Sequence, residues 1–411
     1  MTYWRRVRVT LSLALLACGP APAQRAGPAA EYLYLWTASA DSSQPDFLAV
    51  LDVTEKSDRY GRLVTTLAVP GLQNMPHHTE HQMPADRRLF ANGFATGQTF
   101  VFDLKDPLHP RVAAQFGDME GFTHPHSYLR LPGGHVLATF QMRHERGGKV
   151  PGGLVELTSD GRAVRSRSAN APGLDPMTRV YSAGIVPALD RIVTTTTDMD
   201  VDTPDDAPAF RQLQIWRVSD LTLLHTITLP GGPTGEESML TAEPRVLDDG
   251  RTVLVSTFNC GLYLMQGLDG EKPEGRLVAS FPRKPKTYCA IPVVAGRYYL
   301  VTVPAWSAVV SLDISDPAAP REVSRVTLGP DDVPHWISMS EDRRRVVVTG
   351  YGAMKHRVLI ARFDSATGRL SLDERFRDPG ASVPGFRMDD KTWPHGGSAK
   401  GIPHGSVFGR P

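Results

Sequence analysis

The sequence predicts an all-β fold, a seven-bladed β-propeller, from three observations. Glycine (37 residues) and proline (34 residues) are frequent, as expected for a chain with many turns. No stretch shows a convincing helical period over four turns. A β-rich pattern recurs along the chain, with successive copies starting about 45 to 62 residues apart. That interval matches the ~40–50 residues of a four-stranded propeller blade, with insertions.

The recurring pattern has two fixed positions. It starts at a polar or aromatic residue, continues through alternating apolar residues and a Gly/Asp turn, and ends 14 residues later at a small polar residue. The copies are His78–Asn92, Tyr181–Thr195, Glu243–Thr257, Tyr288–Thr302 and His335–Thr349. A sixth copy starts at His124 or His126 and ends at Thr139. These copies predict the start of six blades.

Two further strands follow each copy, and the link between them also repeats. Asp103–Pro110 parallels Asp313–Pro320, with Asp and Pro at matching positions. Asp and Pro set a tight polar turn between strands. The best examples of these strands are Thr99–Leu104, Leu213–Val218, Ala308–Leu312, Val358–Phe363, Arg111–Phe116 and Arg321–Leu328.

The seventh blade is predicted to be shared by the two ends of the chain. The N-terminal part supplies three strands, at Tyr32–Ala38, Phe47–Val53 and Arg62–Val69. The tail, His404–Phe408, supplies the missing inner strand. Pairing the two ends closes the ring and removes exposed sheet edges. Residues 24–411 are therefore expected to form a single domain, with the segment 142–178 fitting the repeat least well.

Residues 1–23 have the layout of a signal peptide. Basic residues precede the short apolar stretch Val9–Cys18, which is too short to span a bilayer as a mature helix. Ala21–Ala23 fits a small-x-small cleavage site. In an alternative interpretation, Leu15–Cys18 is a lipobox and Cys18 carries a lipid anchor. We expect a periplasmic or secreted protein, or alternatively a membrane-anchored lipoprotein.

The charge balance excludes some partner classes. The chain has 45 Lys+Arg and 44 Asp+Glu, which gives no electrostatic reason to expect nucleic acid or an acidic membrane as a partner. No stretch after the N-terminal segment is apolar enough to predict a transmembrane span.

Histidines at the starts of the inner strands predict a metal site. A propeller's inner strands surround its axis, so their first residues meet at one rim. The predicted ligands are His78, His124, His126, His335 and His404. Imidazole suits Cu, Zn, Fe and Ni, and copper binds most tightly among the divalent ions, so the expected metal is copper. Glu243 is expected to act as an acid/base group or to fix a ligand's tautomer, and His77 is the second acid/base candidate.

The two cysteines beyond the N-terminal segment are expected to be free, buried thiols. Cys289 adjoins Tyr288 at the rim, and Cys260 is assigned to the far end of its own inner strand. A strand of about seven residues rises ~23 Å. A disulfide needs Cα atoms within ~7 Å, so none is predicted.

An ordered series of short motifs resembles the selenium-binding protein and methanethiol oxidase family. The motifs are Asp46–Val53, Lys56–Tyr60, Pro70–Leu72, His77–His78, Gly121–His124, Gly152–Leu157, Leu213–Trp216 and Asp313–Pro317. The resemblance implies a seven-bladed propeller and copper-dependent oxidation of a small thiol by oxygen, giving formaldehyde, hydrogen sulfide and peroxide. It also implies metal-binding histidines, and His77, His78 and His124 occupy matching positions.

The sequence departs from the family pattern in two places. The segment Thr79–Asp86 is short and lacks the family's cysteines, and the Cys-containing C-terminus is replaced by Trp393–Gly397 and Ile402–Gly405. These departures argue against selenium binding and for a site richer in histidine.

Two functions from different classes follow. The first is a copper oxidase acting on a small thiol or a related sulfur compound. The second is a copper-binding or protein-interaction propeller without turnover, because a fold alone does not fix function. A metal-dependent hydrolase or lactonase is a third alternative, for which more carboxylates would be expected at the rim.

Overall fold

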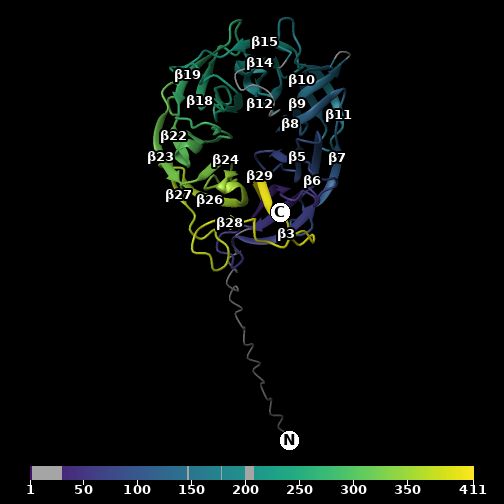
Figure 1. Cartoon of the computed structure of the whole chain (residues 1–411), viewed down its shortest axis with the longest axis vertical. Coiled ribbons are helices and arrows are strands. Elements are labelled where there is room, and N and C mark those ends of the chain that lie inside the picture. Colours follow the sequence, from purple (N-terminus) through teal and green to yellow (C-terminus); the bar gives the residue numbers. More distant parts are fainter. Residues whose placement is uncertain (2–29, 146–147, 177, 200–207) are drawn as a thin grey trace.

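The computed structural model describes residues 1, 30–145, 148–176, 178–199 and 208–411. The described residues form seven antiparallel sheets that follow one another around a common axis, which confirms the predicted seven-bladed propeller (Figure 1). The predicted signal peptide and the lipobox at Cys18 lie outside the described residues. In the described part of the chain, no helical segment has the length and apolar character that a membrane span requires.

Each sheet has four strands on its main path, and the inner strand of each is named first here. The strands of the first three complete blades are β4 (Pro76–Thr79), β5 (Arg88–Gly93), β6 (Gln98–Asp103) and β7 (Arg111–Phe116); β8 (Phe122–Arg130), β9 (Val136–Glu145), β10 (Gly148–Leu157) and β11 (Ala163–Ser168); β12 (Val180–Val186), β13 (Arg191–Thr196), β14 (Gln212–Arg217) and β15 (Leu223–Thr228). The described residues of the segment 142–178, which fitted the repeat least well, include the end of β9 and the two outer strands β10 and β11 of one blade.

The next three blades repeat this order. Their strands are β16 (Thr241–Val246), β17 (Val253–Thr257), β18 (Gly261–Gln266) and β19 (Glu274–Ser280); β20 (Val293–Ala295), β21 (Tyr298–Val303), β22 (Ala308–Asp313) and β23 (Arg321–Thr327); β24 (Asp332–Met339), β25 (Arg345–Gly352), β26 (Arg357–Asp364) and β27 (Arg369–Leu372), with β28 (Phe386–Arg387) paired to β26. Four short 3₁₀ turns lie between strands: η1 (Pro187–Leu189), η2 (Pro208–Arg211), η3 (Pro304–Trp306) and η4 (Ala353–His356).

The last sheet joins the two ends of the chain, as the sequence predicted. Its order is β29 (Gly401–Gly409), β1 (Tyr32–Ser39), β2 (Phe47–Asp52) and β3 (Arg62–Ala68). β29 pairs antiparallel with β1 from Gly409 opposite Tyr32 to Gly401 opposite Ser39. In Figure 1 the yellow β29 lies between β24 and the blade that contains β5 and β6, where it completes the ring.

The hydrophobic core is divided into clusters that lie between neighbouring blades. In one of them, Leu33 and Leu35 of β1 pack with Val347 of β25 and Ile360 of β26, and all four are almost fully buried. Each strand thus presents one face to the blade before it and the other to the blade after it. The near-continuous apolar runs of the middle strands are a consequence of this two-sided burial.

The predicted turn repeat is present. Asp103 and Asp313 each accept a hydrogen bond from the backbone N–H two residues later, at 3.3 and 2.8 Å. Asp106 and Asp316 do the same, both at 2.9 Å. The aspartates therefore stabilise equivalent turns in two different blades.

The prediction of two free thiols was wrong, because Cys260 and Cys289 form a disulfide with a Cα–Cα distance of 5.0 Å. In the structure the 14-residue repeat forms two antiparallel strands joined by its turn, so the residue that ends it lies at the end of the second strand. β17 therefore returns the chain to the rim from which β16 started, and Cys260, just beyond Thr257, arrives beside Cys289.

The disulfide should contribute measurably to stability. It closes a loop with a sequence separation of 29 residues. The chain-entropy account predicts that replacing both cysteines by serine lowers the free energy of unfolding by roughly 3–4 kcal/mol. Denaturant unfolding of the two proteins in oxidising buffer measures this difference. Reductant should shift the wild-type midpoint and leave the double variant unchanged; a wild-type midpoint that ignores reductant under unfolding conditions would contradict the prediction.

Candidate metal centre

Six of the seven inner strands carry a β-bulge at the same rim of the propeller. A bulge places two residues of one strand opposite a single residue of its partner and re-aims their side chains. The register shifts of the six strands enclose His77–His78, His126–Ser127, Tyr181–Ser182, Ala242–Glu243, His335 and His404–Gly405. The chain therefore breaks the alternation of its inner strands just where the candidate site residues lie.

A proline precedes the histidine in four of these bulges. The four dipeptides are Pro76-His77, Pro125-His126, Pro334-His335 and Pro403-His404. Proline has no N–H to give to a sheet, so it is confined to edges and bulges. An inner strand is the edge of its sheet, and the proline supports the bulge without the loss of a ladder hydrogen bond.

The small polar residue that ends each repeat holds the bulge in place. Asn92 Oδ1 accepts a hydrogen bond from the N–H of His78 at 2.6 Å. Thr139 Oγ1 accepts from the N–H of Ser127 at 3.0 Å and donates to the carbonyl of Tyr181, in the next blade, at 2.8 Å. These side chains fix each bulge relative to its neighbour, which explains the fixed spacing seen in the sequence.

The bulges bring five imidazole rings together. The ring centroid of His77 lies 4.5 Å from that of His78, 5.0 Å from that of His126 and 4.2 Å from that of His404. The His335 ring lies 4.9 Å from the ring of His404. All five side chains are buried. They come from the four inner strands β4, β8, β24 and β29, so residues far apart in the sequence meet because the blades are radial. We call these five residues the histidine cluster.

The histidine cluster contains two groups of three that could each hold a metal ion. One is His77, His335 and His404, and the other is His77, His78 and His126. Within each group one nitrogen from each ring lies within 4.8 Å of the other two.

Close contact between two inner strands fixes part of this arrangement. A Cβ atom built at Gly405 would lie 2.7 Å from the carbonyl oxygen of His77 and 2.7 Å from the N–H nitrogen of Thr79. Only glycine therefore allows β29 to lie this close to β4. The contact lets His404 Nδ1 reach the His77 carbonyl oxygen at 2.9 Å.

Backbone carbonyls determine the tautomer of two rings. His404 Nδ1 faces the His77 carbonyl, and His126 Nδ1 faces the Tyr181 carbonyl, each at 2.9 Å. A carbonyl can only accept, so both Nδ1 atoms carry the proton and both Nε2 atoms carry a lone pair. A metal-binding imidazole is usually oriented in this way, by a hydrogen bond from the ring nitrogen that does not bind the metal.

Several ring nitrogens have no hydrogen-bond partner among the described residues: both nitrogens of His77, Nε2 of His126 and Nε2 of His335. Each buried polar atom without a partner costs about 1–3 kcal/mol. Packing therefore does not account for the histidine cluster, whereas coordination of a metal ion would satisfy these atoms. The residues present fit a metal site.

The rings are neutral, which is the state that binds metal. Burial lowers the pKa of His126 to about 3 and that of His404 to about 4. Burial, with the charges of neighbouring histidines, also holds the pKa values of His77, His78 and His335 well below the ordinary value. At neutral pH every ring of the histidine cluster therefore has a lone pair to offer.

A buried carboxylate, Glu243, lies 3.9 Å from His81 Nε2, and the His81 ring lies 6.3 Å from that of His78. Glu243 Oε2 accepts hydrogen bonds from Ser182 Oγ at 2.8 Å and Arg245 Nη1 at 2.6 Å, while Oε1 has no partner among the described residues. Burial raises the pKa of Glu243, and Arg245 opposes the rise. His81 Nε2 accepts from Arg245 Nη2 at 3.1 Å.

Aromatic rings link this carboxylate to the histidine cluster and surround the cluster. His81 stacks on Trp336 at 4.7 Å, and the Trp336 ring lies 4.9 Å from the ring of His78. Other rings within contact of the histidines are Phe94, Tyr181, Phe258 and Tyr351. Tyr351 is 41% exposed, and its hydroxyl lies 3.2 Å from His404 Nε2. This tyrosine therefore connects the histidine cluster with the solvent-exposed surface.

The structure places two predicted rim residues differently from the expectation. His124 has a φ of +58°, which breaks the alternation that would otherwise put it on the same side as His126, and its ring faces Phe94 at 5.7 Å. It belongs to neither three-histidine group. The inner strand β20 starts at Val293, so Tyr288 precedes the strand and contacts Phe258 at 6.1 Å.

His81 was not predicted from the sequence, whereas His77 was predicted as an acid/base group and, from the family resemblance, as a metal-binding histidine. The signal for His77 was the Pro-His dipeptide, which places His77, His126, His335 and His404 in one register. His78 was placed at the first position of the repeat, because it lies 14 residues before Asn92. For His81 no comparable signal exists, because its contact with Arg245 joins two residues that are 164 positions apart in the sequence.

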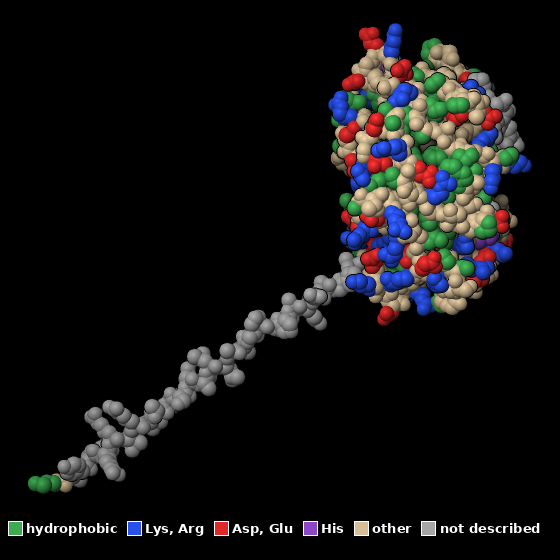
Figure 2. Space-filling view, turned by 90° about the vertical axis from the view of Figure 1, so that its left-hand side faces the viewer, with side chains coloured by type: hydrophobic (Ala, Val, Ile, Leu, Met, Phe, Trp, Pro, Cys, Tyr) green, Lys and Arg blue, Asp and Glu red, His purple; other side chains and the backbone are tan. Residues whose placement is uncertain are grey.

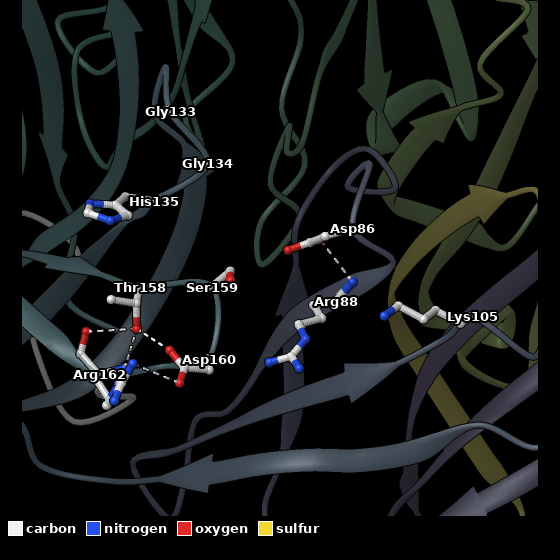
Figure 3. Close-up of a pocket in the computed structure, with 10 residues that line it drawn as sticks. All are labelled: Asp86, Arg88, Lys105, Gly133, Gly134, His135, Thr158, Ser159, Asp160 and Arg162. Carbon is white, nitrogen blue, oxygen red and sulfur yellow. Dashed lines mark hydrogen bonds and ion pairs between the residues drawn. The ribbon is translucent and has the colours of Figure 1, made fainter.

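A separate hollow lies at the opposite ends of the strands. It has a volume of about 570 Å³ and is lined by turn residues, among them Arg88, Lys105, His135 and Asp160 (Figure 3). His135 is held by Glu156 at 2.6 Å, and no group of ligand atoms of the kind found in the histidine cluster is present there among the described residues. The candidate site is therefore the histidine cluster.

Comparison with known proteins agrees with this architecture, although no family model matches the chain. The chain is similar to methanethiol oxidases of a Hyphomicrobium species (28% identity over 227 residues, 49% of each chain) and of Ruegeria pomeroyi (30% over 142 residues, 33% of this chain and 31% of the relative). It is also similar to selenium-binding protein 2 of Arabidopsis thaliana (27% over 172 residues, 38% and 35%). The matches span about half or less of these relatives, and they confirm the predicted resemblance at modest identity.

Solved structures support the fold. A hypothetical selenium-binding protein from Sulfolobus tokodaii superposes with a TM-score of 0.75 at 17% identity, covering 93% of this chain and 94% of that one. A periplasmic gluconolactonase from Pseudomonas aeruginosa superposes with a TM-score of 0.60 at 13% identity, covering 93% and 100%. At these identities the likeness concerns the propeller alone.

Proposed function

We propose that the protein is a copper-dependent oxidase of a small thiol, similar in activity to a methanethiol oxidase. The observation that carries the proposal is the histidine cluster, in which five buried, neutral imidazoles converge and leave ring nitrogens without partners. The relatives named methanethiol oxidase support the choice of reaction.

The donor set is the reason for proposing copper. Both three-membered groups consist entirely of imidazoles, with no carboxylate or thiolate. Imidazole suits Cu, Zn, Fe and Ni, and copper is bound most tightly of the divalent ions. His77, His78, His126, His335 and His404 would hold the ion. When bound, copper would supply a redox-active centre whose positive charge favours a thiolate over a thiol.

The overall reaction balances with oxygen as the oxidant. Methanethiol, oxygen and water would give formaldehyde, hydrogen sulfide and hydrogen peroxide. Glu243 is our acid/base candidate for the thiol proton, because its Oε1 atom is buried without a partner while Oε2 is held by Ser182 and Arg245. The aromatic rings around the cluster would limit the access of water.

We also propose that the protein is exported. The Cys260–Cys289 disulfide supports this, because disulfides persist in oxidising compartments and are rare in the cytosol. A soluble periplasmic or secreted form follows from cleavage after Ala23, and a lipoprotein follows from modification of Cys18.

Oxygen consumption tests the oxidase proposal. Copper-loaded protein should consume oxygen with methanethiol and produce hydrogen peroxide. His335→Ala should bind less copper than the wild type and lose at least about 100-fold of the rate, because direct ligation outweighs the ~10–100-fold effect of outer contacts. His109→Ala is the matched control, since that side chain is exposed and pairs with Asp106. Protein that holds copper but consumes no oxygen with methanethiol or related small thiols would favour the non-catalytic alternative.

A further inference from the structure

The two three-histidine groups share one residue. His77 belongs to both, whereas His335 and His404 belong only to the first and His78 and His126 only to the second. No larger group that unites His335 with His78 or His126 is found among the described residues. A single ion would therefore reach one group and leave two rings of the other without a contact to metal.

The His77 ring lies between the two groups. It stacks on His78 at 4.5 Å with an interplanar angle of 19°, and it lies 4.2 Å from the ring of His404. Both of its nitrogens are buried without a hydrogen-bond partner among the described residues. In the histidine cluster this is true of His77 alone. An imidazole with two unpartnered nitrogens is what a ligand shared between two ions requires.

The two groups are built in the same way. Each contains one ring whose Nδ1–H is held by a backbone carbonyl, His404 in the first group and His126 in the second. That contact leaves Nε2 of each ring as the ligand atom. The first group adds Nε2 of His335, which has no partner among the described residues. The second adds His78, whose two ring nitrogens each lie 3.2 Å from a hydroxyl, of Ser127 and of Tyr181. Three imidazoles around an ion leave a position open for substrate or water.

We infer that the histidine cluster holds two metal ions, one in each group, with His77 shared between them. The inference rests on the proposed metal-binding function and adds a second position to it. Neutral His77 carries one N–H proton, and this proton leaves to solvent when both nitrogens bind. The negative charge then left on the ring would offset part of the repulsion between the two cations.

Metal counting tests the inference without an activity assay. Full-length protein titrated with copper should bind two ions per chain by elemental analysis. His335→Ala and His78→Ala, which each remove a ligand from one group only, should each bind one. His109→Ala should bind two. Cu(II) electron paramagnetic resonance should show two interacting ions in the wild type and an isolated ion in each single variant.

The outcomes are distinguishable. One copper per wild-type chain, with an isolated resonance signal, would overturn the two-ion inference and leave the proposed oxidase intact. No bound copper would overturn both. If either variant fails to fold by circular dichroism, the wild-type stoichiometry and resonance signal alone decide the question.

Discussion

Replacing His77 with leucine should abolish tight copper binding and leave the metal-free protein at least as stable as the wild type. Leucine has a volume similar to that of histidine, and both nitrogens of His77 are buried without a partner among the described residues. Removing an unsatisfied buried polar group in favour of an apolar one is neutral or stabilising. Because His77 belongs to both groups, copper affinity should fall by more than about 100-fold, beyond the ~10–100-fold effect of an outer contact.

Two measurements on one preparation check this result. Thermal unfolding of the metal-free proteins gives the stability, and copper titration gives the affinity. The backbone carbonyl that orients His404 is kept in His77→Leu, so the rest of the cluster is preserved. A variant that is several kcal/mol less stable and still binds copper would show that His77 is a packing residue.

Deleting the C-terminal strand, residues 401–411, should prevent the chain from folding to a stable monomer. β29 is the inner strand of the blade that closes the ring. Val407 and Phe408 are almost fully buried, and each contributes about 1.5–3 kcal/mol. The deletion also removes the backbone partners of β1 and exposes Leu33 and Leu35. Together these losses are comparable with the about 5–15 kcal/mol that stabilises a whole domain.

Circular dichroism and denaturant unfolding of the shortened protein measure the effect. The control is a chain that lacks only Arg410 and Pro411, which lie outside β29 and should be tolerated. A cooperative transition at the wild-type midpoint after deletion of residues 401–411 would show that the ring does not depend on closure by the two ends.

The sequence contained enough information for the architecture. Alternating apolar residues and the Asp/Pro turns predicted the strands, and the unpaired N-terminal strands predicted closure by the tail at His404. These signals are local, and the propeller repeats them in each blade. The surface also matches the balanced composition, with acidic and basic side chains interspersed on the face shown in Figure 2.

The failed expectations concern how the repeat folds in three dimensions. Assigning Cys260 to the far end of its own inner strand separated it from Cys289, whereas the antiparallel pair β16–β17 brings their Cα atoms to 5.0 Å. The left-handed backbone at His124 and the bulges at the inner strands likewise depend on tertiary contacts. A hydrophobic pattern shows where a strand lies, but it does not show where the alternation of side chains is interrupted.

The position of copper in crystals of the loaded protein tests the central claim most directly. Anomalous diffraction at the copper edge should place copper within coordinating distance of ring nitrogens of His77 and of at least two other members of the histidine cluster. Copper bound only at surface histidines such as His109, with the cluster empty, would contradict the account.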